Sequence, residues 1–349
     1  MDINAQNNYY YTPLHLAVIN NNLEAVNELI RLGADIDITD NLGKTAYFFA
    51  KEQKNDVIMS ALDKAGANQK IIPKEIKGEY FGMPKPGSKP EIFAPGLVST
   101  MKGFEFAGTF SPDNNEYFFT QRDLGFGQRI RYFKREKDKW SNIDFAPFTY
   151  DCFEFEPFVT VDGNKVYYGS RRPLPEDTVI NKRTAIWMSE KINLKWSPPK
   201  LVGEQMMYVT LSQNGTLYTT DLSGKVSGLI NRVYQDGKFK EGVSLGDNVN
   251  FMSSTAHPYI APDESYVIFD AQPDGFEAGA RFFISFRKKD GTWTDPAKLS
   301  DEINKGDVMC PKVSPDGKYF FFNSNKDGYS DIYWISADFI KKMKKNILK

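Results

Sequence analysis

The sequence predicts an α+β multidomain protein: a short pair of helical repeats, followed by an all-β five-bladed propeller of four-stranded blades. Two internal periodicities support this prediction, one of 33 residues at the N-terminus and one of about 50 residues over the remainder of the chain. Aromatic residues make up 14% of the 349 residues, which favours half-buried strands in the larger module. We expect the repeats at 1–67, a linker at 68–90, the propeller at 91–338 and a basic C-terminal helix or tail at 339–349.

The 33-residue periodicity aligns residues 2–34 with residues 35–67. Thr12 suits a helix N-cap and Pro13 suits the first helical turn, while Gly33 suits the end of a second helix. The stretch TPLHLA at 12–17 resembles the ankyrin-repeat signature. The resemblance implies stacked helix pairs, and it gives His15 a structural role between neighbouring turns. Because the chain starts in the middle of a repeat, we expect an N-terminally truncated pair.

A change of composition separates the two modules. Between residues 68 and 96, prolines alternate with glycines, which disfavours helix and predicts an extended linker. Near its end, EIFAPGLVST (91–100) is typical of a short strand, and APGLVS (94–99) within it is similar to the predicted outer-strand segments SPPKLV and DPAKLS. We therefore expect residues 94–99 to supply the outer strand of the last blade and to close the ring, which removes open sheet edges.

Five copies of a strand–turn–strand motif define the longer periodicity. Their turns are anchored at Asp113, Asp162, Asn214, Asp263 and Asp316, with spacings of 49 to 53 residues. Asp or Asn in these turns bonds the local backbone, and an aromatic-rich second strand follows. The set resembles the SPDG-type, WD-repeat-like motifs of TolB-like propellers. That resemblance implies a propeller, but such repeats occur in binding proteins, in peptidase caps and in polysaccharide-active enzymes.

Composition excludes several classes of function. Lys and Arg total 44 against 45 Asp and Glu, which gives no broad electrostatic reason to expect nucleic acid as a partner. No apolar run is long enough for an integral membrane segment. Cys152 and Cys310 are too few for a thiolate cluster, and the two histidines fall in different modules, so we expect neither a metal nor another cofactor.

The compartment follows from the N-terminus. It lacks the pattern of an export signal, so the protein is expected to be cytoplasmic as written, or periplasmic or secreted if upstream sequence is missing.

The predicted binding site is one mouth of the propeller channel, at the end where the first strand of each blade begins and the second strand ends. Six positions before each anchor lie Ala107, Glu156, Tyr208, His257 and Cys310. We expect the propeller to bring toward this mouth a set of charged and polar candidates for ligand binding: Glu105, Arg122, Glu154, Glu156, Arg171, His257, Asp270 and Asn323.

Two functions remain open. The favoured one is a non-catalytic, bacterial interaction protein that recognises a protein or glycan ligand through the channel mouth and the ankyrin surface. The alternative is a carbohydrate-active enzyme, a glycoside hydrolase or lyase, which needs two carboxyl groups about 5 to 9.5 Å apart across an open cleft. A nucleophilic pair of Cys310 and His257 on adjacent blades is less favoured, and no catalytic residue is assigned. A purely structural role for the Arg, Asn and Glu candidates is also open.

Overall fold

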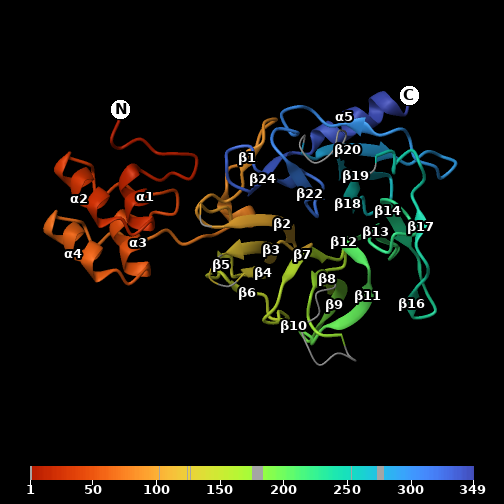
Figure 1. Ribbon diagram of the computed structural model, residues 1–349, viewed down its shortest axis with the longest axis horizontal. Helices are drawn as coiled ribbons and strands as arrows, with labels where there is room; N and C mark the ends of the chain where they lie inside the picture. Colours follow the sequence, from red (N-terminus) through yellow and green to blue (C-terminus); the bar gives the residue numbers. More distant parts are fainter. Residues whose placement is uncertain are drawn as a thin grey trace. The chain divides into compact units, whose positions relative to one another are not determined.

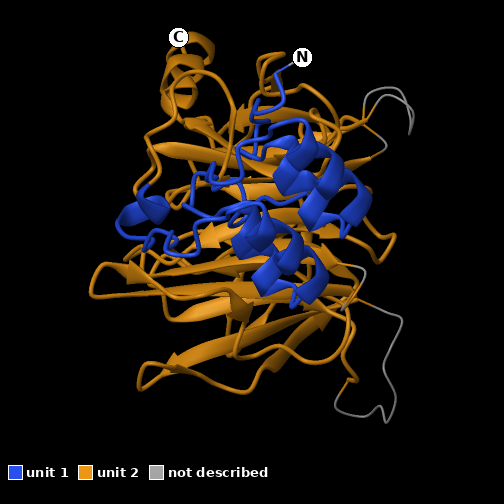
Figure 2. Ribbon diagram, turned by 90° about the vertical axis from the view of Figure 1, so that its left-hand side faces the viewer, with its two compact units in different colours: residues 1–82, 94–101 blue, residues 83–93, 102–349 orange. Residues whose placement is uncertain are grey.

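The computed structural model describes residues 2–101, 103–123, 125, 127–174, 184–252, 254–272 and 279–349. It divides into two compact units, coloured separately in Figure 2. Residues 1–82 and 94–101 form the N-terminal unit, and residues 83–93 and 102–349 form the propeller unit.

The N-terminal unit contains two helix pairs that begin in the same way (Figure 1). Its helices are α1 (Pro13–Ile19), α2 (Leu23–Arg31), α3 (Ala46–Glu52) and α4 (Asp56–Lys64), followed by the 3-10 turn η1 (Glu79–Gly82). Thr12 and Thr45 cap the first helix of each pair, and Asn22 and Asn55 cap the second. Matching caps at a separation of 33 residues confirm the predicted repeat.

His15 connects the two repeats. The side chain is 1% exposed, and Nε2 lies 3.2 Å from the backbone oxygen of Lys44 in the second repeat. Burial lowers the pKa of His15, although the hydrogen bond to the Lys44 carbonyl partly opposes that shift. The predicted structural role of His15 is confirmed.

The propeller unit is a ring of five antiparallel sheets, with the first strand of each blade nearest the middle in Figure 1. Blade one comprises β2 (Phe104–Phe110), β3 (Glu116–Asp123), β4 (Gly127–Glu136), β5 (Lys139–Trp140) and β6 (Asp144–Phe145). Blade two comprises β7 (Glu154–Val159), β8 (Lys165–Ser170), β9 (Ala185–Ile192), β10 (Lys195–Trp196) and β11 (Lys200–Glu204).

The other blades repeat this order. Blade three comprises β12 (Met206–Leu211), β13 (Leu217–Asp221), β14 (Leu229–Arg232) and β17 (Val243–Ser244), with a small ribbon of β15 (Tyr234–Gln235) and β16 (Lys238–Phe239). Blade four comprises β18 (Thr255–Ile260), β19 (Tyr266–Ala271), β20 (Arg281–Phe286) and β21 (Ala297–Lys298). Blade five comprises β22 (Val308–Val313), β23 (Tyr319–Ser324), β24 (Asp331–Ser336) and β1 (Glu91–Ile92).

The anchor residues fix the turns between first and second strands. Each anchor oxygen accepts a backbone N–H from the residue two positions later, at 3.0 to 3.1 Å in all five blades. This side-chain bond stabilises the turn locally, so that the same short motif produces the same hairpin five times. The predicted five-bladed propeller is confirmed.

The outer strand of blade five comes from the N-terminal side, as predicted, and it is the start of the predicted 91–100 strand rather than residues 94–99. In β1, Glu91 and Ile92 pair with Trp334 and Tyr333 of β24. The predicted strand at 94–99 is wrong, because Ala94 and Gly96 have φ values of 44° and 77° and the Gly96 N–H donates to the Ser99 oxygen at 2.8 Å. These residues form a reverse turn, which cannot pair with a sheet.

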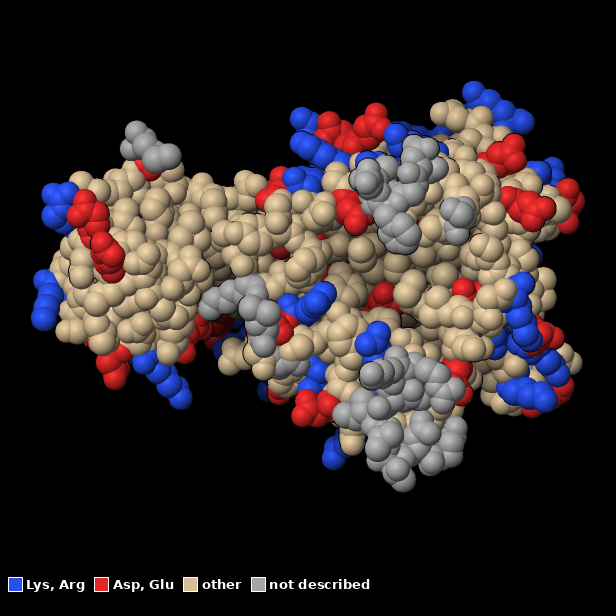
Figure 3. Space-filling view, viewed as in Figure 1, with Lys and Arg blue, Asp and Glu red and all other residues tan. Residues whose placement is uncertain are grey.

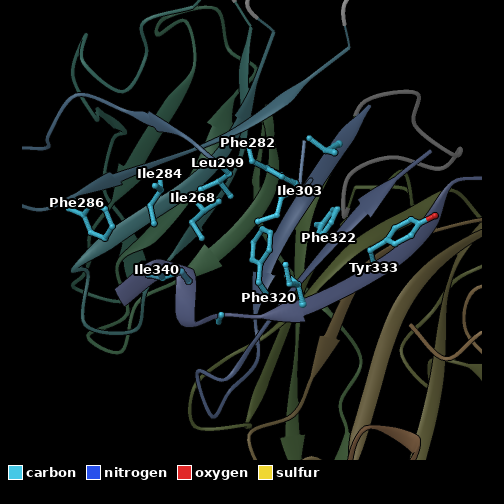
Figure 4. Close-up of a cluster of buried hydrophobic side chains, with 13 residues drawn as sticks. Ile268, Phe282, Ile284, Phe286, Leu299, Ile303, Phe320, Phe322, Tyr333 and Ile340 are labelled. Atoms are coloured by element: carbon cyan, nitrogen blue, oxygen red, sulfur yellow. The ribbon is translucent and has the colours of Figure 1, made fainter. Parts of the chain in front are cut away.

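Aromatic side chains fill the seams between blades. At the seam of blades four and five, Phe282, Phe320 and Phe322 lie in one buried cluster with Ile340 of α5 (Asp338–Ile347), as Figure 4 shows. Phe320 and Phe322 alternate along β23 with Phe321, which contacts Phe93 and Trp334 on the other face. The aromatic strand therefore packs on both faces. No helix within the described ranges is long and apolar enough to cross a membrane.

Candidate ligand site in the propeller channel

Every first strand contains a β-bulge at the same place. The register shifts in the pairings of β2, β7, β12, β18 and β22. The bulge residues have positive φ angles of 53°, 58°, 54°, 48° and 58°; they are Ala107, Glu156, Tyr208, His257 and Cys310, called the bulge ring below. A bulge re-aims one side chain, and a positive φ is unfavourable for these residue types. Five equivalent bulges turn one side chain per blade toward the channel.

The polar centre of the bulge ring is His257. Its Nδ1 lies 2.8 Å from one oxygen of Asp270, and its Nε2 lies 3.5 Å from Oε1 of Glu156. All three side chains are buried. Burial disfavours the charged imidazole, but the carboxylates of Asp270 and Glu156 outweigh it and raise the pKa of His257 to about 10. Burial also raises the pKa of Asp270, and the imidazole opposes that shift.

Cys310 and Tyr208 complete the ring's polar atoms. Ligand atoms of Cys310, His257 and Glu156 all lie within 4.8 Å of one another. Burial, with the nearby Glu156 and Asp270 carboxylates, raises the pKa of the Cys310 thiol well above its usual range. The Tyr208 hydroxyl donates to the Pro311 carbonyl. The raised pKa of the thiol disfavours the thiolate that a nucleophilic Cys310–His257 pair would need.

Beyond the bulge ring, toward the anchored turns, the channel widens into a cavity of about 230 Å³. Phe158, Tyr259, Phe321 and Lys312 line it, and we call it the turn-side pocket. Among the described residues, the Lys312 ammonium has no hydrogen-bond partner, although it is 4% exposed and lies 4.4 Å from the Phe158 ring centre. Burial lowers the pKa of Lys312 to about 7. The lining is mainly apolar, with Lys312 as its cation, Asp316 as an acidic group and hydroxyls from Thr109, Thr160 and Ser314.

Three of the predicted site residues have structural partners. Glu105 accepts from the Gln121 amide at 3.0 Å, and Glu154 forms a buried ion pair with Arg172 at 2.5 Å. Asn323 donates to the Glu105 backbone oxygen at 2.8 Å, which links blade five to blade one. These contacts give Glu105, Glu154 and Asn323 places in the framework of the ring.

Two predicted arginines lie on aromatic rings. The Arg122 guanidinium lies 5.9 Å from the Phe104 ring centre, and that of Arg171 lies 4.6 Å from the Phe153 ring centre. On the face of the propeller seen in Figure 3, basic and acidic side chains are intermixed around the rim. The channel therefore brings together Glu156, His257 and Asp270, and it does not bring the arginines to them.

Lys312 is the residue that the sequence analysis missed. It lies four positions before its anchor, where the other blades have Thr109, Phe158, Thr210 and Tyr259. The signal in the sequence is that this position carries a lysine in one blade and apolar or hydroxyl-bearing residues in the other four. Two cysteines and two histidines are too few for a metal site of one ligand type, but Glu156, His257 and Cys310 are a mixed set.

Comparisons with known proteins give the N-terminal unit a family. Residues 1–50 match the family model described as ankyrin repeats (many copies). Over 60 residues the chain is 40% identical to the nuclear factor NF-kappa-B p105 subunit of Rattus norvegicus, and equally so to that of Gallus gallus. The matched segment is 17% of this chain and only 6% of each relative. The two repeats at residues 2–67 are ankyrin repeats.

Among solved structures, the chain is similar to proteins of several kinds. TolB from Acinetobacter baumannii is 12% identical, with a TM-score of 0.45 over 84% of this chain and 69% of that one. An alpha-L-arabinofuranosidase from Lactobacillus brevis is 10% identical, with a TM-score of 0.43 over 68% of this chain and 92% of that one. Neither likeness assigns an activity to this chain.

Proposed function

We propose that the chain is a non-catalytic binding protein whose turn-side pocket holds an apolar group bearing a carboxylate, presented by a protein ligand. The supporting observation is Lys312, whose buried ammonium meets no hydrogen-bond acceptor within the described part of the chain. A buried cation without such a partner costs stability, and a ligand carboxylate would recover part of that cost. The aromatic lining would cover the ligand's apolar part.

The lining favours a protein ligand over a glycan. A sugar brings hydroxyls that each need a partner when buried, and much of the lining, including Phe158, Phe321 and Val159, offers none. An acidic or C-terminal carboxylate beside an apolar side chain matches the pocket better. The ankyrin repeats support the same choice, because stacked repeats form extended surfaces for other proteins.

The acidic groups of the channel favour binding over glycoside hydrolysis. Hydrolysis needs one carboxyl group as acid and a second as base or nucleophile on either side of a substrate. Glu105 and Glu154 are engaged by Gln121 and Arg172, and Glu156 and Asp270 flank one imidazole. Nitrophenyl glycosides are therefore expected to remain intact. Turnover that Glu156→Gln abolishes would establish the enzyme instead.

A small aromatic acid tests the binding proposal. Phenylpropionate and its neutral amide would be titrated into the full chain, with binding followed by ligand-observed NMR. We expect the acid to bind and the amide to bind about tenfold more weakly or worse, since a charge-assisted hydrogen bond contributes about 1.5 to 3 kcal/mol. Lys312→Met should remove the preference.

The control is Lys298→Met, which removes a lysine of β21 in blade four whose ammonium is paired with Asp301 on the surface. It should bind phenylpropionate as the unchanged chain does. Equal binding of acid and amide, or an unchanged preference in Lys312→Met, would overturn the proposal.

A further inference from the structure

We infer that the bulge ring is a binding site for a divalent transition-metal ion, with Glu156, His257 and Cys310 as ligands. The three residues come from blades two, four and five, and one ligand atom of each lies within 4.8 Å of the others. Each stands at a bulge with positive φ, so the backbone aims all three side chains at one point. This site is distinct from the turn-side pocket, and it does not depend on the proposed function.

The hydrogen bonds of His257 leave its Nε2 atom available to bind a metal ion. Asp270 accepts from Nδ1 at 2.8 and 3.0 Å, so Nε2 faces Glu156 and the centre of the ring. Histidines that bind metals generally donate their second ring N–H to a carboxylate or carbonyl, which fixes the ring and its tautomer. Asp270 supplies that orientation here.

Glu156 gives an independent indication of a ligand. Its Oε2 is buried, and none of the described residues offers it a hydrogen bond. The Glu156 side chain is 6% exposed, so water has little access to this oxygen. An unpartnered carboxylate oxygen at this depth is costly, and a cation beside it would satisfy it.

The ligand set indicates the class of metal. Thiolate, imidazole and carboxylate together suit Zn²⁺ and Co²⁺ and disfavour Mg²⁺ and Ca²⁺, which prefer oxygen ligands. The remaining ring positions supply no further ligand, because Ala107 has no donor atom and the Tyr208 hydroxyl is bonded to Pro311. Three protein ligands leave a coordination position for water or another exogenous ligand.

Metal binding exchanges protons for the ion. Any proton on Nε2 of His257 and the Cys310 thiol proton leave to solvent, and the ion forms bonds to nitrogen and sulfur in their place. The carboxylate of Glu156 binds as it is. No oxidant or reductant takes part.

The experiment uses Zn²⁺ and Co²⁺ on the full chain. After chelator treatment, the protein would be unfolded and refolded with either ion, dialysed and analysed for bound metal. We expect stoichiometric zinc, a higher thermal unfolding temperature with zinc than with chelator, and a thiolate-to-cobalt charge-transfer band with Co²⁺.

Three variants and one control assign the ligands. Cys310→Ser should abolish the cobalt–thiolate band, and Glu156→Gln should weaken zinc binding. Asp270→Asn, which changes only the orienting residue, should weaken zinc binding by about 10- to 100-fold. Cys152→Ser removes the other cysteine, which lies outside the ring, and should change neither measurement.

Measurements on the unmodified chain alone can overturn the inference, even if one of the variants fails to fold. Refolded wild-type protein that retains no zinc, or that binds cobalt without a thiolate band, would overturn the inference. A band that survives Cys310→Ser and disappears in Cys152→Ser would also overturn it. Loss of phenylpropionate binding in Lys312→Met bears only on the turn-side pocket.

Discussion

Each unit buries one histidine, and the two side chains are held in opposite states of charge. His15 of the ankyrin pair faces backbone and hydroxyl groups, and burial lowers its pKa. His257 of the propeller lies between Asp270 and Glu156, and its pKa is raised to about 10. At neutral pH the first imidazole is uncharged and the second carries a positive charge. Burial alone therefore does not decide the charge of a histidine; the neighbouring carboxylates do.

The two environments also differ in what creates them. The contacts of His15 come from the repeat itself, because Thr12 lies three residues before it and Lys44 immediately precedes the equivalent threonine of the next repeat. The contacts of His257 require three blades, since Glu156 comes from blade two and Cys310 from blade five. A local histidine site reinforces a fold, whereas a convergent one concentrates polar groups at a place where a ligand can be held.

The largest expected effect on stability comes from removing the counter-charge of His257 in the propeller. In Asp270→Asn, the His257 imidazole loses its closest counter-charge while it stays buried, which should cost about 3 to 5 kcal/mol of the free energy of unfolding. Urea unfolding in the presence of a chelator, followed by tryptophan fluorescence, measures this, because all five tryptophans belong to the propeller.

The control is Asp301→Asn, since the Asp301 side chain is 91% exposed and pairs with Lys298 on the surface. It should change the free energy of unfolding by no more than about 0.5 kcal/mol. A loss in Asp270→Asn as small as in this control would mean that His257 is not held as a cation.

The next largest effect should be a gain in the free energy of unfolding, on removing the charge from the turn-side pocket. Lys312→Met replaces a buried ammonium without a hydrogen-bond acceptor, among the residues that the structure describes, by an apolar side chain of similar length. The chain should become about 1 to 3 kcal/mol more stable in the same urea experiment, because burying an unsatisfied polar group carries a cost of that size. The control Lys298→Met removes a surface pair with Asp301 and should leave stability nearly unchanged. A destabilised Lys312→Met would show that its contacts with Phe158 and Tyr208 outweigh the cost of burial.

The sequence predicted the architecture because the architecture is repeated. Five turns with Asp or Asn at one position are a local signal five times over, and they placed the bulge positions six residues earlier. The closing strand was misplaced because similarity of APGLVS to other outer strands could not reveal the positive φ of Ala94. The convergence of Glu156, His257 and Cys310 could not be predicted either. It depends on distances across the channel that strand order does not fix.

A smaller effect separates a shared helix cap from the histidine contact in the ankyrin pair. Thr45→Ala removes only the cap of α3 and should cost about 1 kcal/mol, a typical value for such a cap. Thr12→Ala removes the equivalent cap of α1 and also the 2.8 Å contact of its hydroxyl with His15 Nδ1. We expect Thr12→Ala to cost more than Thr45→Ala when unfolding is followed by helical circular dichroism. Equal losses would mean that the hydroxyl of Thr12 does not help to hold His15.

The smallest expected effect is the pH dependence of the ankyrin pair. Because the pKa of His15 is lowered in the folded state, the unfolded chain takes up a proton first as pH falls below about 6.5. The stability linked to His15 is therefore present above that pH and is lost as pH falls toward the folded-state pKa. Helical circular dichroism in urea should show unfolding at lower denaturant concentration at pH 5 than at pH 7, while tryptophan fluorescence reports the propeller separately.

His15→Gln should flatten the pH dependence of the helical transition over that interval. An unchanged slope in His15→Gln would assign the dependence to other groups. Asp40 is not one of them, because burial raises its pKa and a raised carboxyl pKa makes the folded state more stable as pH falls.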